Sequence, residues 1–197
     1  MFRFAFKIFT ITAICLFGCK KDSSDEIPSV PFAFQAFFSN GDTHLIKEGF
    51  EGTNSFGRAG AVIDTAGHYF EIQSTNFTGG GNKVSIYFMK TFSEQPDTAG
   101  IHSIFHTGSE PYGCSEPDSL KDGVEIILVD TAGRKWSTAY GNQNSASFTV
   151  TEHKKNDFDL FTPFMTSGEF DCVFYDSLGN ALQNMSGSFT GRSVVYP

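Results

Sequence analysis

The sequence predicts an all-β protein, an antiparallel β-sandwich of about ten strands, with a closed barrel as the alternative. Three features support this class. Phenylalanine is abundant, at 23 of 197 residues. Short runs rich in aromatic and β-branched residues alternate with turn residues such as glycine, asparagine, aspartate and proline. No stretch places apolar residues at the helical period between capping residues.

The strands are expected at short intervals. The aromatic run 32–38 ends at Asn40-Gly41, which is the strongest short hairpin signal. The glycine run 79–81 leads into the long strand 83–91, and residues 176–179 turn the last hairpin. The expected strands are 32–38, 43–46, 61–64, 68–74, 83–91, 101–106, 124–129, 134–140, 147–152, 169–175 and 181–190.

Two longer loops separate some of these strands. The loop 107–123 is rich in glycine, proline and serine and carries Cys114, and the loop 153–159 is polar. Asp157 and Asp159 in the second loop lack the remaining positions of a calcium-binding loop. Neither loop has the composition of an interdomain linker, so residues 32–197 are expected to form a single β domain.

The N-terminus predicts a secretory signal. Arg3 and Lys7 form a positively charged region before an apolar run, 8–17. This run is too short to cross a bilayer, because a span takes about 20 apolar residues. The stretch Leu-Phe-Gly-Cys that ends at Cys19 resembles the lipobox of bacterial lipoproteins. The resemblance implies that residues 1–18 are a signal peptide and that Cys19 is acylated. The alternative is an ordinary signal peptide in which Cys19 has no special role.

Residues 19–31 are polar and contain serine and proline, which predicts a flexible tether. Lys20 stands where an aspartate would resemble an inner-membrane retention signal, so the outer membrane is expected. The acidic cluster of Asp22, Asp25 and Glu26 resembles the export signals of surface lipoproteins in the Bacteroidota. The expected location is therefore the outer membrane, with the domain lipid-anchored and facing either the periplasm or the cell surface.

Charge and motifs narrow the function classes. Without residues 1–18 the chain has 12 basic and 22 acidic residues, which gives a formal net charge of −10. This acidic balance argues against nucleic-acid binding. The glycine run 79–81 lacks the spacing of a phosphate-binding loop, and the chain has no nucleophile elbow. On an extended strand His102 and His106 would lie about 13 Å apart, too far to share a metal ion. No catalytic residue, cofactor or metal site is predicted.

Cys114 and Cys172 are the cysteines that remain besides the anchor after processing. An oxidising compartment allows them to form a disulfide, and this bridge would contribute roughly 4 kcal/mol in the chain-entropy model. The alternative is two unpaired thiols, one on a loop and one in a strand.

The tetrapeptide Asp-Thr-Ala-Gly occurs three times, starting at Asp64, Asp97 and Asp130. The starts are evenly spaced, but the flanking residues do not match, which excludes an internal repeat. An aspartate at the first turn position accepts hydrogen bonds from backbone N–H groups, and glycine supplies a positive φ. The motif and the similar stretch 176–179 therefore predict turns, although Asp97 follows Pro96 in a longer loop and is less clearly in a hairpin.

The same positions resemble an O-glycosylation sequon of secreted Bacteroidota proteins, in which aspartate precedes serine or threonine and then a small or aliphatic residue. Five matches occur where roughly one is expected by chance, although turn chemistry itself enriches these pairs. The resemblance implies modification of at least one of these exposed hydroxyl groups. The candidates are Thr65, Thr98, Ser119, Thr131 and Ser177.

Two groups of side chains bear on ligand binding. Glu169 and Asp171 share one strand face about 7 Å apart, a separation similar to that of glycosidase carboxylates, but such pairs are more often a solvated face. The aromatic residues outside the phenylalanines form either a sugar-stacking platform or part of the core, and the core is favoured for Trp136. These aromatic residues are Tyr69, Tyr87, Tyr112, Trp136 and Tyr140.

The whole layout resembles the small, Phe-rich β lipoproteins of unknown function in the Bacteroidota. The resemblance rests on the lipobox, the opening strand PFAFQAFFSNG and the closing hairpin GEFDCVFYDSLGNALQNMSGSFTGR. No activity follows from it. The first hypothesis is a non-enzymatic outer-membrane lipoprotein that binds a glycan or a surface protein. The alternatives are a carbohydrate-acting hydrolase and a lipocalin-like barrel that carries a small apolar ligand.

Overall fold

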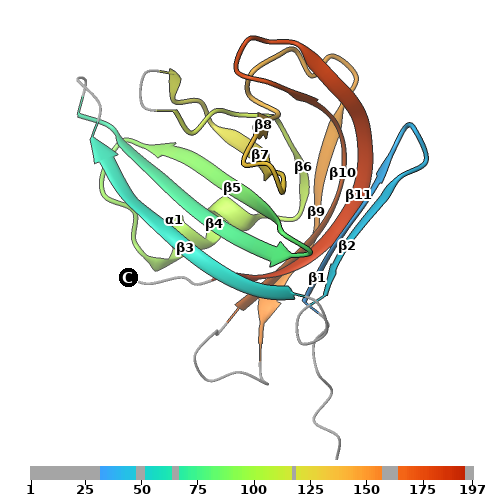
Figure 1. The fold of residues 1–197 in the computed structure, drawn as a ribbon. Coiled ribbons are helices and arrows are strands. Elements are labelled where there is room, and N and C mark those ends of the chain that lie inside the picture. The colour runs from blue at the N-terminus through green and yellow to red at the C-terminus, as the bar shows by residue number, and fades with distance from the viewer. Residues whose placement is uncertain (1–31, 48–51, 64–66, 117–118, 157–163, 194–197) are drawn as a thin grey trace, which may run out of the picture.

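The structure, a computed structural model, describes residues 32–47, 52–63, 67–116, 119–156 and 164–193. These residues confirm the all-β class. They contain eleven strands, which belong to one antiparallel sheet. The sheet curves around its own inner face until it is nearly barrel-shaped (Figure 1).

The strands follow one another along the chain with one helical interruption after β5. That interruption consists of the short helix α1 (Thr98–His102) and the 3₁₀ turn η1 (Ser103–Phe105). Across the sheet the order is β2-β1-β11-β10-β8-β7-β5-β4-β3, while β9 also pairs with β10, and β6 pairs with β9. The strands are β1 Ala33–Phe38, β2 Thr43–Lys47, β3 Gly52–Ile63, β4 Tyr69–Gly79, β5 Asn82–Phe92, β6 Gly108–Glu110, β7 Gly123–Val129, β8 Lys135–Ser137, β9 Ser147–Lys155, β10 Phe164–Tyr175 and β11 Ala181–Ser193.

The edge strand β3 meets β11, which lies two strands in from the other edge of the sheet, through hydrogen bonds that involve side chains. The backbone N–H of Arg192 on β11 donates to Oδ1 of Asn54 on β3 at 2.8 Å, and Nη1 of Arg192 donates to the Asn54 carbonyl at 2.7 Å. Asn54 in turn donates from Nδ2 to Oγ1 of Thr75 on β4 at 3.0 Å. These contacts draw β11 across β3 and β4 without a ladder between them in the described residues.

Phenylalanine rings fill the space inside the curved sheet. The rings of Phe34 and Phe170 stack with centroids 5.5 Å apart, and those of Phe88 and Phe105 lie 5.0 Å apart. Each buried ring removes about 150–250 Å² from water, so this cluster is the main source of stability. The fully buried phenylalanines are Phe34, Phe77, Phe88, Phe105, Phe148 and Phe174.

One expected strand is wrong. Residues 101–106 form part of α1, then η1, instead of a strand, because Asp97 caps a helix there: its Oδ1 accepts from the backbone N–H of Gly100 at 2.8 Å. At five residues α1 is too short to show a helical period in the sequence. Its buried Ile101 and the following Ile104 and Phe105 pack into the core, which explains their apolar pattern.

The other differences are the short strand β6, which lies within the expected loop 107–123, and several changes in strand length. β3 begins at Gly52, β4 extends to Gly79, and β9 extends to Lys155, so polar stretches that were expected to be loops are partly in the sheet. Cross-strand hydrogen bonds to long neighbours hold these polar residues extended, which local sequence does not reveal.

Candidate functional site

The candidate site is a hollow of about 330 Å³ at one end of the sheet, hereafter the mouth hollow. It forms where the ends of β1, β2, β7, β8 and β11 converge. The mouths of β-barrels are frequent ligand sites. Its lining residues are Phe38, Asp42, His44, Leu128, Asp130, Arg134, Trp136, Leu182 and Gln183.

Strand register explains why side chains distant in the sequence meet here. Trp136 on β8 pairs with Leu128 on β7, and Leu128 pairs with the core residue Val84, so the indole lies on the inner face of the sheet. His44 on β2 pairs with the buried Ala36 of β1, so its ring also faces inward. The mouth hollow is therefore the uncovered end of the inner face, above the phenylalanine core.

The β7–β8 turn shapes one wall of the mouth hollow. Oδ1 of Asp130 accepts from the backbone N–H groups of Ala132 and Arg134, each at 2.9 Å, and its Oδ2 accepts from Arg134 Nε at 2.7 Å. The Arg134 guanidinium lies 5.8 Å from the centre of the Trp136 ring. The backbone N–H of Arg134, and then its side chain, hold the pKa of Asp130 below its usual value. The wall thus presents an ionised carboxylate, a guanidinium and an indole in fixed positions.

The β1–β2 turn forms the opposite wall. Asn40 Nδ2 donates to Oδ2 of Asp42 at 2.8 Å, and the backbone N–H of Asp42 donates to Asn40 Oδ1 at 2.9 Å. The ring of Phe38 meets His44 edge-on with centroids 4.9 Å apart. With its amide rotated to satisfy its neighbours, Gln183 accepts from the backbone N–H of Asn40 at 2.7 Å. Side-chain bonds therefore hold this turn against β11.

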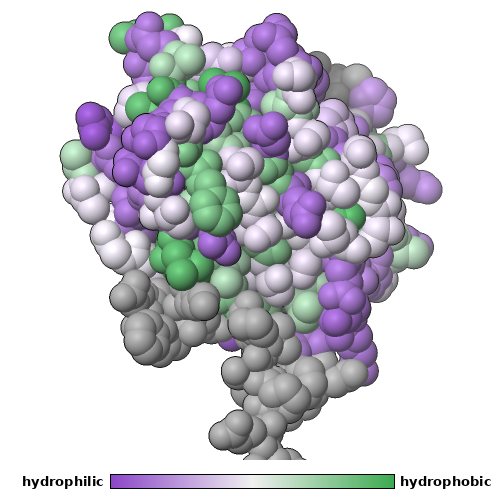
Figure 2. All heavy atoms as spheres, turned by 90° about the vertical axis from the view of Figure 1, so that its right-hand side faces the viewer, coloured by the Kyte–Doolittle hydropathy of each residue, from purple (hydrophilic) through white to green (hydrophobic). Residues whose placement is uncertain are grey.

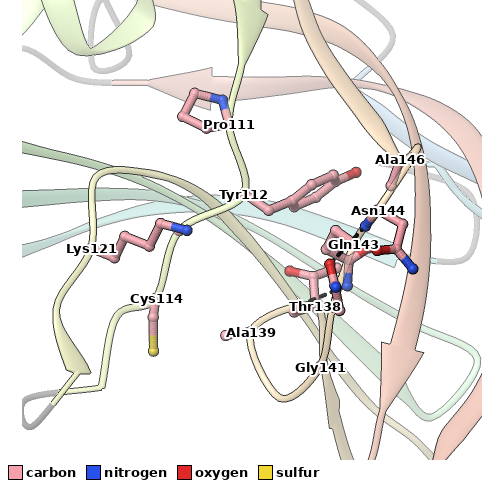
Figure 3. Close-up of a pocket in the computed structure, with 12 residues that line it drawn as sticks. Pro111, Tyr112, Cys114, Lys121, Thr138, Ala139, Gly141, Gln143, Asn144 and Ala146 are labelled. Atoms are coloured by element: carbon pink, nitrogen blue, oxygen red, sulfur yellow. Dashed lines mark hydrogen bonds between the residues drawn. The ribbon is translucent and has the colours of Figure 1, made fainter.

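A second hollow, of about 400 Å³, lies beside the loops 111–114 and 138–146, and hereafter is the side hollow (Figure 3). Its main polar side chains already serve the fold. The hydroxyl of Tyr112 donates to the carbonyls of Asp171 at 2.9 Å and Ser147 at 3.2 Å. Gln143 is bonded to the backbone of Thr138 and Val173. The polar side chains of the side hollow therefore hold the surrounding loops in place, and we do not treat it as the candidate site.

The carboxylates of Glu169 and Asp171 line a third, shallow hollow of about 400 Å³ on the outer face of β10, with the half-exposed ring of Phe37. Both residues are exposed and project from the same face of one strand. Acid–base pairs of glycosidases have one carboxyl group in an apolar setting and the other in a polar one. Serine and threonine surround both carboxylates here, so the two environments are alike.

The outer face around β1 and β2 carries separate apolar side chains instead of one apolar surface. Figure 2 shows this side, with small apolar patches set among hydrophilic and intermediate residues. Phe37 is 49% exposed and Leu45 44% exposed. Isolated apolar residues of this kind are common on protein surfaces.

The structure contains Cys114 and Cys172 as free thiols, so the disulfide considered from the sequence is not formed in it. Cys172 is a buried member of the phenylalanine core, while Cys114 lies in the loop that borders the side hollow. Burial raises the pKa of both thiols above their usual value. Neither thiol is therefore an activated nucleophile.

The recurrent tetrapeptide serves two structural purposes. At Asp130 the motif closes a hairpin, and the similar stretch that starts at Asp176 closes another. In each turn the aspartate Oδ1 accepts hydrogen bonds from two backbone N–H groups, and the glycines, Gly133 and Gly179, have φ values of 78° and 79°. At Asp97 it caps α1 instead. The turn prediction is thus confirmed at Asp130, and Asp97 is a helix cap.

The glycosylation candidates lie where an enzyme could reach them, in so far as they are described. Thr98, Ser119, Thr131 and Ser177 are all exposed. Thr65 and Cys19 lie outside the described residues, as do residues 1–31, Asp157 and Asp159. Glycosylation of the candidate residues and acylation of Cys19 therefore stay predictions.

His102 and His106, which were expected to lie too far apart to share a metal ion, have different neighbours in the structure. His106 Nδ1 lies 2.7 Å from Glu110 Oε1 at the surface, whereas His102 Nδ1 lies 3.1 Å from Nε2 of His153 on β9. His153 Nδ1 bonds Thr166 Oγ1 at 2.9 Å, and Thr166 donates to Ser193 Oγ. Among the described residues no three histidine, cysteine or acidic side chains are grouped as a metal site.

The aromatic residues considered as a stacking platform do not share one surface. Trp136 lines the mouth hollow and Tyr112 the side hollow, while Tyr87 packs on a small cluster on the outer face of β4 and β5. Sequence reasoning missed Asp42, His44 and Arg134 as partners of Trp136. Asp42 and His44 lie on one hairpin and Arg134 on another, about 90 residues further along the chain. Only their positions near strand ends could have indicated that they line one opening.

Comparisons with protein-family models, with curated protein sequences and with solved structures give no match. The class defined by the structure is thus an all-β domain with a polar and aromatic mouth hollow. None of its described helices has the length and apolar character needed to cross a membrane.

Proposed function

We propose that the protein is a lipid-anchored outer-membrane or cell-surface domain that binds a glycan or a surface protein at the mouth hollow, without catalysis. The mouth hollow is the observation that carries this proposal. It combines an indole, a guanidinium and two carboxylates on an opening above a packed core. Open hollows with a few converging polar groups are the usual form of binding sites.

The anchor is supported by the N-terminal pattern that ends at Cys19. Two or three acyl chains on this cysteine would hold the protein stably, because each buried CH₂ contributes about 0.8 kcal/mol. Residues 19–31 reach at most about 45 Å when extended, at 3.3–3.6 Å per residue. The domain would therefore remain close to the membrane surface.

The two alternatives have weaker support. A hydrolase would use Glu169 and Asp171, but serine and threonine side chains surround both carboxylates, so neither has the apolar setting of a general acid. A carrier of apolar ligands would need internal space, and the inner face described here is occupied by phenylalanine rings. The mouth hollow, in contrast, needs no rearrangement to admit a ligand.

Mass analysis of the protein isolated gently from its native membrane tests the anchor. We expect an acylated N-terminal peptide that begins at Cys19 and loss of membrane retention in Cys19→Ala. Peptide mapping of the same sample reports added sugar mass at Thr65, Thr98, Ser119, Thr131 or Ser177. An unmodified cysteine in a membrane-free protein would contradict the anchor.

A thermal-shift screen of the full-length chain tests the binding role, since a ligand that binds only the folded state raises Tm. Glycans, lipid vesicles and purified surface proteins are the probes. We expect at least one to raise Tm in the parent protein and in Asn180→Ala, and to have less effect in Arg134→Ala. Arg134 and Asn180 hold equivalent places in the two Asp hairpins, but only Arg134 lines the mouth hollow. No shift with any probe would refute the binding role.

A further inference from the structure

We propose that the mouth hollow binds a neutral saccharide unit, with Trp136 as the platform under the sugar ring. This inference rests on the proposed binding function and names the ligand class. It is carried by the unused hydrogen-bonding groups of the mouth hollow, by its charge and by its size.

Several polar atoms in the mouth hollow have no hydrogen-bond partner among the described residues. They are the indole N–H of Trp136, the two Nη groups of Arg134 and the ring nitrogens of His44. Asp42 uses only Oδ2 for its bond from Asn40. These donors and acceptors line the same hollow as the Trp136 ring, and the Arg134 guanidinium lies 5.8 Å from the centre of that ring. Such an arrangement suits a ligand whose hydroxyl groups both donate and accept while its C–H face rests on the ring.

The charge of the mouth hollow favours a neutral ligand. Asp42 and Asp130 are negative and Arg134 is positive, and Arg134 already pairs with Asp130 at 2.7 Å. With His44 counted as neutral, the mouth hollow has one net negative charge, and the whole chain has −8. An anionic ligand such as a uronate or a phosphate would therefore be repelled.

The size of the mouth hollow favours a small unit over a protein surface. At about 330 Å³ it lies near the lower end of the range of small-molecule sites, about 300–1,000 Å³. A stable protein interface needs about 800 Å² from each partner. Among the described residues the exposed large apolar side chains are few, and Leu182 alone of them lines the mouth hollow, so they do not extend it into such a surface. A terminal or single sugar unit fits these dimensions best.

Trp136 supplies the test, because it is the single tryptophan of the chain. Its fluorescence reports any ligand that enters the mouth hollow. The full-length chain is purified in a detergent without a sugar headgroup and titrated with the methyl glycosides of glucose, galactose, mannose and N-acetylglucosamine. Glucuronate and galacturonate are the charged counterparts.

We expect a saturable fluorescence change with at least one neutral glycoside and about tenfold weaker binding, or none, with the uronates. Arg134→Ala should weaken the neutral ligand about tenfold, the loss expected for a hydrogen bond to a charged group. Asn180→Ala should leave the affinity unchanged. Arg134 is 70% exposed, so its removal does not disturb the core, whereas replacing Trp136 would.

A response to uronates alone, or one that Arg134→Ala does not weaken, would overturn the saccharide assignment. The outcomes also separate this inference from the proposed function. If vesicles or a purified surface protein change Trp136 fluorescence while no glycoside does, the mouth hollow binds ligands but the saccharide assignment is wrong. If no probe of any class changes the fluorescence or Tm, both are wrong.

Discussion

The side-chain amide of Gln143 hydrogen-bonds both backbone groups of Val173. Its Oε1 accepts from Val173 N–H at 2.9 Å, and its Nε2 donates to the Val173 carbonyl at 2.8 Å. Val173 lies on β10 between the last residue paired with β9, Asp171, and the one paired with β8, Tyr175. Gln143 thus replaces a missing strand residue in the ladder.

Gln143→Ala should lower the free energy of unfolding by about 1–3 kcal/mol, because it leaves two partly buried backbone groups without partners. Urea unfolding at neutral pH measures the loss. Ser145→Ala in the same loop is the matched control and should change stability by less than about 0.5 kcal/mol. A loss no greater than that of the control would show that water replaces the amide.

Gly191 and Thr75 set the closest approach between β11 and β4. A Cβ atom at Gly191 would collide with the Thr75 side chain and lie 3.0 Å from Cζ of Phe77. Gly191→Ala should therefore separate the strands and cost about 1–3 kcal/mol. Unfolding of Gly191→Ala, Thr75→Ala and the double variant measures their coupling.

We expect the double variant to be more stable than the sum of the two single losses predicts, because Thr75→Ala removes Oγ1, the atom that the new methyl group would meet first. Ser186→Ala, at an exposed position of β11, should be neutral. Additive losses would place the strain of Gly191→Ala elsewhere than at Thr75.

His153 makes the protein less stable in acid. Burial, and then the nearby His102, lower its pKa from 6.5 to about 4. Between these values the unfolded chain binds a proton that the folded chain does not. The contribution is therefore fully present above pH 6.5 and is lost as pH falls toward 4. At 1.36 kcal/mol per pH unit the upper bound of the loss is about 3 to 4 kcal/mol, and solvent screening of the partly exposed ring lowers it.

Urea unfolding from pH 7.5 to 4 compares the parent with His153→Gln, which does not titrate. Below pH 6.5 the free energy of unfolding of the parent should fall more steeply with decreasing pH than that of His153→Gln. Above pH 6.5 the two curves should have the same slope. Gln95→Ala, at an exposed site and with no titratable side chain, is the control and should follow the parent closely. Parallel curves for the parent and His153→Gln would contradict the depressed pKa.

Cys114 and Cys172 should differ in accessibility although both resist reaction at neutral pH. The thiolate is the reactive form, and burial raises the pKa of each thiol. Iodoacetamide should label Cys114 slowly in the folded protein and Cys172 only after denaturation, because Cys172 is 1% exposed. Peptide masses without prior reduction provide the measurement. A peptide that joins the two cysteines would show that a disulfide forms after all.

Local chemistry determined the parts of the fold that the sequence predicted well. The hairpin at Asn40-Gly41 and the turns at Asp130 and Asp176 depend on residues within four positions of one another, so their sequences suffice. The all-β class follows in the same way from short aromatic and β-branched runs. Asp97 shows the limit of this reasoning, because one tetrapeptide closes a hairpin in one place and caps a helix in another.

Tertiary structure alone decided the curvature of the sheet and the mouth hollow. Asn54 and Arg192 meet across 138 residues of sequence, and Asp42 and Trp136 line one opening although they lie on different hairpins. Strand order and register place these side chains together, and both depend on how the phenylalanine core packs. The local sequence shows which residues are polar or aromatic. Which of them become neighbours across the mouth hollow is decided only when the sheet curves.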